Sequence, residues 1–129
     1  MKIDNELIAK FMGMIQNPYD KKSFSKEQFY VFEDGEHLGV WEYPAFHTSW
    51  DWIMPVVEKI NEPEVIGGKI IRRAADVTIF YKACKIEYLA DENFEDRDNL
   101  EIHQQGETKI EAVYKAVVDF IKWYNQQKP

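Results

Sequence analysis

The chain has 129 residues and a formal net charge of −7, and it is 45% hydrophobic, 15% aromatic and 30% charged. This length and aromatic content predict one folded domain over residues 1–129, and they exclude a disordered, collagen-like or disulfide-rich chain. The single cysteine, Cys84, cannot form an internal disulfide. Its apolar neighbours predict a small buried side chain, in a reducing, cytoplasmic setting.

The N-terminal segment and the distribution of charge bear on where the chain acts. Acidic residues directly follow a single lysine in Met1 to Glu6, so no secretory signal is expected. No run approaches the roughly 20 apolar residues of a membrane span. Basic residues cluster only at 21–26 and at 69–73, which we interpret as a solvated loop and a solvated strand end. Nucleic acid is therefore not an expected partner, because affinity for phosphate needs clustered cations.

The first predicted helix covers residues 6–16. The N-cap candidates Asp4 and Asn5 precede it, and its apolar residues recur at helical spacing. Gly13 lies inside the pattern and predicts close packing against a neighbouring element. Asn17-Pro18 ends the helix, since the residue before a proline disfavours helical backbone angles.

Strand patterns follow at 29–32 and 38–43, joined by an Asp-Gly turn signal that favours a hairpin. The next helix is predicted to begin after Thr48 or Ser49 and to end before Pro63. Its start resembles a capping box in which an aspartate replaces the usual glutamate. A proline one turn in predicts a kink.

Residues 65–73 are strand-like and are interrupted by a Gly-Gly pair, and residues 77–89 form a longer strand-like run. The parity of the apolar residues changes within the second run, from Val77 and Ile79 to Cys84 and Ile86. A strand with one buried face cannot change parity without a bulge or turn, so we predict a break near 81–83.

The clearest element is the C-terminal helix, which is predicted to run to about residue 125. Thr108 and Glu111 form a capping box at its start, after a short edge strand at 100–102. Trp123 falls outside the main apolar stripe of this helix. It is either covered by a sheet edge or another helix, or it forms a subunit contact.

Together these patterns predict an α+β fold. Three helices are expected to pack on a mainly antiparallel sheet of 4–5 strands, as an α/β/α sandwich, because hairpin-length connections dominate.

Few residues form a pattern that indicates chemistry. The acidic loop at 91–98 lacks the glycine and the final glutamate of an EF-hand, so calcium is not expected there. None of His37, His47 and His103 has a second histidine or cysteine at metal-ligand spacing. No dinucleotide, phosphate-loop or nucleophile-elbow motif is present, so we expect no metal and no cofactor. His47 is the most interesting histidine, because it lies near Asp51 at a helix start and could pair with that carboxylate.

Two segments resemble a known family. They are Asn5-Glu6-Leu7-Ile8-Ala9-Lys10-Phe11-Met12-Gly13, and Tyr43 through Thr48-Ser49-Trp50-Asp51 to Val56-Val57-Glu58-Lys59-Ile60. Both are similar to small phage and prophage proteins of the α-β-α sandwich type. The helix at 110–125 resembles the closing helix of short, uncharacterised proteins from Bacteroides-type genomes and their phages. The resemblance implies an α/β/α sandwich and provides no catalytic residues.

The leading functional hypothesis is a non-catalytic accessory or interaction protein of a phage or mobile element. Its partner would be a second copy, as a homodimer, or another protein. The expected interaction surface comprises aromatic and polar residues before and within the second helix, with one tryptophan of the last helix: Tyr43, His47, Trp50, Asp51, Trp52 and Trp123. One alternative is a small enzyme that uses His47 and Asp51 with Cys84 or Glu42. A second alternative is an acidic decoy of a nucleic-acid-binding protein, because residues 1–64 carry a net charge of −6.

Overall fold

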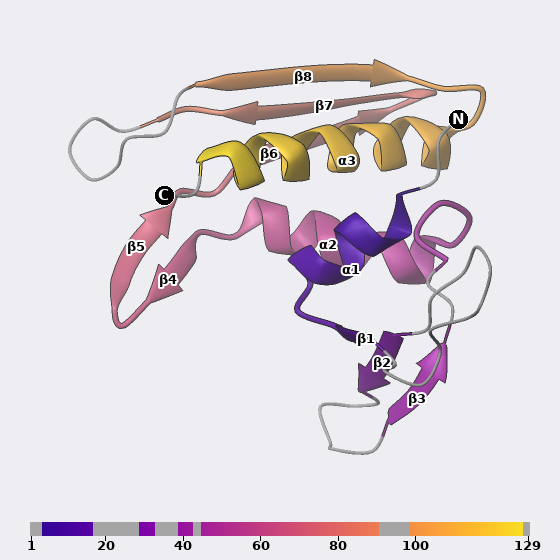
Figure 1. The fold of residues 1–129 in the computed structure, drawn as a ribbon. Helices are drawn as coiled ribbons and strands as arrows, with labels where there is room; N and C mark the ends of the chain where they lie inside the picture. The colour runs from indigo at the N-terminus through magenta and orange to yellow at the C-terminus, as the bar shows by residue number, and fades with distance from the viewer. Residues whose placement is uncertain (1–3, 17–28, 33–38, 43–44, 91–98, 128–129) are drawn as a thin grey trace.

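The computed structural model describes residues 4–16, 29–32, 39–42, 45–90 and 99–127 (Figure 1). In this part of the chain the elements are α1 (Asn5–Phe11), β1 (Ile15–Gln16), β2 (Phe29–Phe32), β3 (Gly39–Glu42), α2 (Trp50–Asn61), β4 (Glu64–Ile66), β5 (Lys69–Arg72), β6 (Asp76–Phe80), β7 (Ala83–Tyr88), β8 (Leu100–Gln105) and α3 (Lys109–Gln127). All strand pairs are antiparallel. The predicted α+β class, with helices against an antiparallel sheet, is confirmed.

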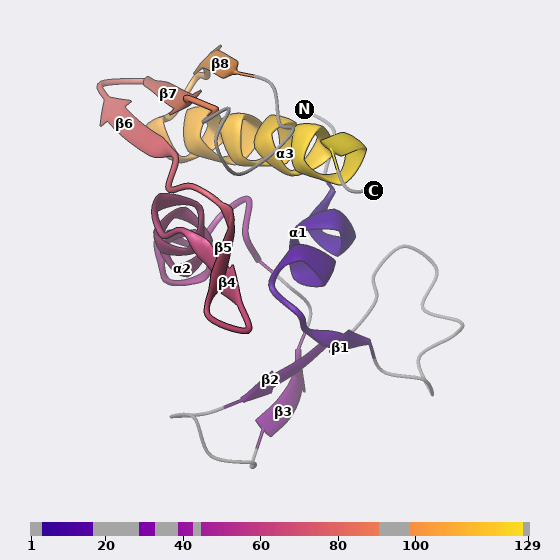
Figure 2. The ribbon, with the colours of Figure 1, turned by 90° about the vertical axis from the view of Figure 1, so that its left-hand side faces the viewer.

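The strands form three small sheets, in the orders β1-β2-β3, β4-β5 and β6-β7-β8. The prediction of one sheet of 4–5 strands is therefore wrong in its count. The helices lie on one side of the β6-β7-β8 sheet, with α3 against β7 and β8, α2 against β6 and α3, and α1 against α3 (Figure 2). The described helices are thus all on one side of this sheet, whereas the predicted sandwich places the sheet between helices.

The division into separate sheets has a local cause at the end of α2. The Ala75 N–H donates to the Ile60 carbonyl at 3.1 Å, and the Val77 N–H donates to Asn61 Oδ1 at 3.3 Å. This end of α2 thus satisfies backbone donors on the outer edge of β6, where β5 would otherwise pair. β5 instead pairs with β4, and the β4–β5 hairpin projects from the helical layer (Figures 1 and 2).

Glycines with positive φ set two of the chain reversals. Gly67 and Gly68 have φ values of +60° and +78° and turn β4 into β5, so the predicted interrupted strand is a hairpin. Gly13 has φ of +75° and follows the end of α1, which is shorter than predicted. Apart from its chain neighbours, no atom of the described residues lies within 4 Å of the position that a Cβ would take at Gly13. This glycine therefore ends the helix, and the predicted close packing is wrong.

The predicted break in residues 77–89 is confirmed. β6 and β7 pair across a two-residue turn, in which Tyr81 has φ of +48°. Cys84, Ile86 and Tyr88 then lie on the inner face of β7, where they are fully buried against α3. The change of parity in the sequence was the signal for this turn.

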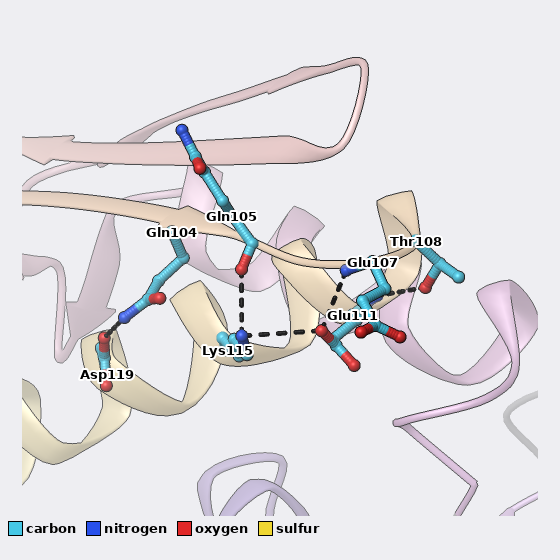
Figure 3. Close-up of polar contacts among 7 residues, drawn as sticks. All are labelled: Gln104, Gln105, Glu107, Thr108, Glu111, Lys115 and Asp119. Atoms are coloured by element: carbon cyan, nitrogen blue, oxygen red, sulfur yellow. Dashed lines mark hydrogen bonds and ion pairs between the residues drawn. The ribbon is translucent and has the colours of Figure 1, made fainter. Parts of the chain in front are cut away.

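The second and third helices begin near their predicted starts, but with different caps. Ser49 is the N-cap of α2 and makes no side-chain capping hydrogen bond, so the predicted capping box there is not formed. At α3 the Glu111 N–H donates to Thr108 Oγ1 at 3.2 Å, as predicted (Figure 3). Glu111 Oε1 accepts from the Glu107 N–H at 3.0 Å, and this hydrogen bond holds the pKa of the Glu111 carboxyl below its usual value.

Arg72 is buried, which corrects the interpretation of residues 69–73 as a solvated strand end. Its side chain is 1% exposed and lies over the rings of Phe120 and Tyr124. The guanidinium donates to four backbone carbonyls, which belong to Lys59, Ile60, Glu62 and Arg73, at 2.9–3.2 Å. Three of these carbonyls are at the end of α2, where intrahelical donors are missing, so Arg72 satisfies the C-terminus of that helix.

Candidate functional site

A polar cluster joins the starts of α1 and α3 to the segment before α2. Asn5 Nδ2 donates to His47 Nδ1 at 2.9 Å, and the His47 ring lies 6.0 Å from the Tyr114 ring. The Tyr114 hydroxyl accepts from the Asp4 N–H at 2.5 Å, and burial raises the pKa of Tyr114. The cluster fixes three segments against one another.

The structure does not bring together the residues of the enzyme hypothesis. Asp51 is exposed, and none of the contacts in the described part of the chain joins it to His47. Cys84 lies on the inner face of β7, in the sheet layer, whereas His47 contacts α1 and Tyr114. The side chain of Glu42 is outside the described residues.

Cys84 is a buried thiol without the features of a nucleophile. Burial raises its pKa to about 11 from the usual 9.0, because desolvation disfavours the thiolate. The unfolded chain loses this proton near pH 9, whereas the folded chain keeps it until about pH 11.

The raised pKa of Cys84 predicts a pH-dependent loss of stability. Between pH 9 and 11 the unfolded state binds fewer protons than the folded state, so this group lowers stability by roughly 1 kcal/mol for each pH unit. Urea unfolding of the parent and of Cys84→Ala at pH 8, 9, 10 and 11 measures the effect. The difference between the two proteins should change across this window. A constant difference would contradict the assignment.

The tryptophans of the expected interaction surface occupy different environments. Trp50 is exposed at the start of α2, and Trp52 is half-buried with its ring 5.2 Å from the Phe46 ring. Trp123 is half-buried, with its ring 5.1 Å from the Tyr88 ring and 5.5 Å from the Phe120 ring. Tyr88 of β7 thus covers one side of Trp123. This contact agrees with cover by the sheet, which was one of the two environments expected for Trp123. Tyr43 lies outside the described residues.

Among the residues whose exposure is described, the largest exposed aliphatic group is on the β4–β5 hairpin, which the sequence analysis did not single out. Val65, Ile66 and Ile70 are 52%, 63% and 39% exposed. Val65 is opposite Ile70 on one face, and Ile66 is opposite Lys69 on the other. Valine and isoleucine on both sides of a Gly-Gly pair were the available signal for a projecting apolar hairpin.

The outer face of the β6-β7-β8 sheet is polar along most of its length. The strand register places Asp76, Glu87 and Glu101 in one row, and Lys85 pairs with Glu87 at 3.4 Å. Phe80, at the end of β6, stacks on His103 with ring centroids 6.0 Å apart. The carboxylate row is short and includes one ion pair, so it forms no continuous acidic stripe.

Among the described residues, no group of histidine, cysteine, aspartate and glutamate is placed to hold a metal ion. His37 and the acidic loop at 91–98 lie outside the described residues. No described helix combines the length and the apolar character needed to span a membrane. No protein family, curated protein or solved structure matches this chain.

Proposed function

We propose that this chain is a non-catalytic interaction protein, which uses the β4–β5 hairpin to bind another protein. The observation that carries the proposal is the exposure of Val65, Ile66 and Ile70 on a hairpin that projects from the helical layer (Figures 1 and 2). The resemblance to small phage and prophage proteins supports a role as an accessory protein of a phage or mobile element. The proposed setting is cytoplasmic, with no nucleic acid as partner.

The energetics of a hairpin explain why a partner is expected there. A two-stranded hairpin is marginally stable in water, and aliphatic side chains on its surface gain about 1.5–3 kcal/mol each when they are fully buried. The base of the hairpin is fixed, because Arg72 is buried and Tyr124 donates to Glu64 Oε1 at 2.6 Å. The tip is therefore a positioned apolar surface, and Lys69 gives it a positive charge. We propose that the partner offers an apolar groove with an acidic rim.

The test is photo-crosslinking from the hairpin tip. A photoreactive amino acid at Val65, which is exposed and lies opposite Ile70 on the same face of the hairpin, is expected to give one discrete adduct in cells that express the full chain. The same group at Glu58, an exposed position on α2, is the matched control and should give no such adduct. Ile70→Asp on the same hairpin should abolish the adduct, because it places a charge in the apolar contact. An adduct that persists with Ile70→Asp, or that forms equally from Glu58, contradicts the proposal.

The two alternative functions gain no support from the described contacts. The enzyme hypothesis requires His47 to meet Asp51 or Cys84, and the described contacts include neither pair. The decoy hypothesis rests on the net charge of −6 in residues 1–64, part of which lies outside the described residues. On the outer sheet face, Lys85 and His103 lie among the carboxylates. The interaction role therefore remains our proposal.

A further inference from the structure

In the described part of the chain, no strand pairs with the outer edge of β8. β8 ends the order β6-β7-β8, and no described strand lies beyond it. The N–H of Gly106, the residue after β8, donates to the Lys82 carbonyl, just before β7. Backbone groups alternate in direction along a strand, so the even-numbered residues of β8 point theirs toward β7. The odd-numbered residues, Glu101, His103 and Gln105, point theirs outward. An edge of this kind is a template for another strand.

The sequence of β8 favours a second copy of the same strand as its partner. Two copies related by a two-fold axis pair in antiparallel fashion, and each register places a different residue opposite Glu101. One register places Glu101 opposite itself, which repels. The next register places Glu101 opposite His103 of the second copy, at both ends of the contact. Here the imidazole can donate a hydrogen bond to the carboxylate, so donor and acceptor are complementary.

A third register is disfavoured by a contact at the end of β8. It would pair Glu101 with Gln105, whose carbonyl already accepts from Lys115 Nζ at 3.0 Å (Figure 3). The register that places Glu101 opposite His103 leaves this contact intact. It also places Ile102 opposite Ile102 of the second copy, on the inner face. The residues of β8 thus select one pairing.

The flank of α3 beside β8 independently fits a two-fold contact. Gln104 Nε2 donates to Asp119 at 2.6 Å, and Lys115 contacts Gln105, so these helical residues border the edge of β8 (Figure 3). At helical spacing this flank is Glu111, Lys115, Asp119 and Lys122. Its charges alternate in sign, and such a series is complementary to itself when two copies run in opposite directions.

The spacing of the two helices is also suitable. α3 packs on both β7 and β8, so its axis lies over the space between these two strands. The two-fold axis would lie half a strand spacing beyond β8, which is about one strand spacing from the axis of α3. Strand spacings of about 4.8 Å then place the two α3 helices about 10 Å apart, which is a normal distance for packed helices. We infer that the chain forms a two-fold homodimer by pairing β8 with β8 of a second copy, Glu101 opposite His103, which continues the sheet to six strands. The inference does not depend on the function proposed for the hairpin.

The first test uses the direction of the His103 N–H. Because that N–H points away from β7, His103→Pro removes a donor of the dimer and spares the pairing with β7. Loss of one donor in each copy is expected to weaken the dimer by at least about 30-fold. His103→Thr keeps the N–H and is the matched control, which should still dimerise. Sedimentation equilibrium of the full chain over a range of concentrations measures both.

The second test examines the register. Glu101→Lys alone and His103→Glu alone should each weaken the dimer, whereas the double variant should restore it, because it places a lysine opposite a glutamate across the contact. Failure of the double variant to restore the dimer overturns the proposed register. A parent chain that remains monomeric at all concentrations overturns the dimer itself.

A third measurement needs no variant that risks failing to fold. In the parent protein, amide hydrogen exchange at Glu101 and His103 should slow as the concentration rises, because dimerisation buries these N–H groups. Slowing that is confined to other segments overturns the inference. Ile70→Asp on the hairpin should leave the dimer unchanged, so failure of the hairpin proposal and failure of the dimer are distinguished.

Discussion

Replacing Arg72 by methionine is expected to lower the free energy of unfolding by about 3–5 kcal/mol, although methionine has a similar length and is apolar. The guanidinium donates to four carbonyls, and leaving buried carbonyls without donors costs about 1–3 kcal/mol each before relaxation. The substitution also removes the contact of the cation with the rings of Phe120 and Tyr124. The loss should therefore be larger than the gain from burying an apolar side chain.

Arg73 is the matched control for this prediction, because it is the next residue and is exposed. Its guanidinium makes a single exposed hydrogen bond to the Leu89 carbonyl at 3.1 Å. Arg73→Met should change the free energy of unfolding by no more than about 0.5 kcal/mol, as is usual for surface substitutions. Urea unfolding monitored by tryptophan fluorescence measures both variants. If Arg72→Met costs no more than Arg73→Met, Arg72 does not hold the end of α2.

The sequence predicted those features of the fold that depend on residues close together in the chain. The capping hydrogen bond at Thr108 and the turn at Tyr81 follow from spacing and parity over a few residues. The helical periodicity of α3 predicted its buried face, including Val113, Val117 and Phe120. Local patterns of this kind need no knowledge of what packs against the element.

The features that were missed depend on distant parts of the chain. Arg72 is in a short basic run that is typical of solvated segments, and only the arrival of α2 and α3 buries it. The separation of β5 from β6 likewise depends on the end of α2, which accepts hydrogen bonds from backbone N–H groups at the edge of β6. No periodicity in the sequence reports such an edge, so the count of strands in one sheet and the order of layers could not be predicted.

The exposure of the candidate interaction surfaces also depends on contacts between distant parts of the chain. Aromatic residues drew attention to Trp52 and Trp123, yet both rings contact buried aromatic residues. Large apolar side chains are enriched both in cores and in interfaces, so their presence alone does not separate the two. The hairpin residues Val65, Ile66 and Ile70 resembled an ordinary strand, and only the three-dimensional arrangement leaves them exposed.

Replacing Phe120 by alanine should have an effect similar in size to that of Arg72→Met. Phe120 is fully buried, and its ring lies 6.4 Å from the Phe11 ring and 5.5 Å from the Trp123 ring. It therefore joins α1 to α3 and lies beneath the guanidinium of Arg72. A cavity of this kind in a core costs about 3–5 kcal/mol.

The control for Phe120→Ala is Gln126→Ala, at an exposed position of the same helix, which should change stability by no more than about 0.5 kcal/mol. Because Arg72 lies over the Phe120 ring, the two substitutions should not be additive. A double-mutant cycle with Arg72→Met should give a coupling energy of about 0.5–3 kcal/mol, measured by urea unfolding. Strict additivity would show that the cation and the ring are energetically independent, and that the carbonyls alone account for the contribution of Arg72.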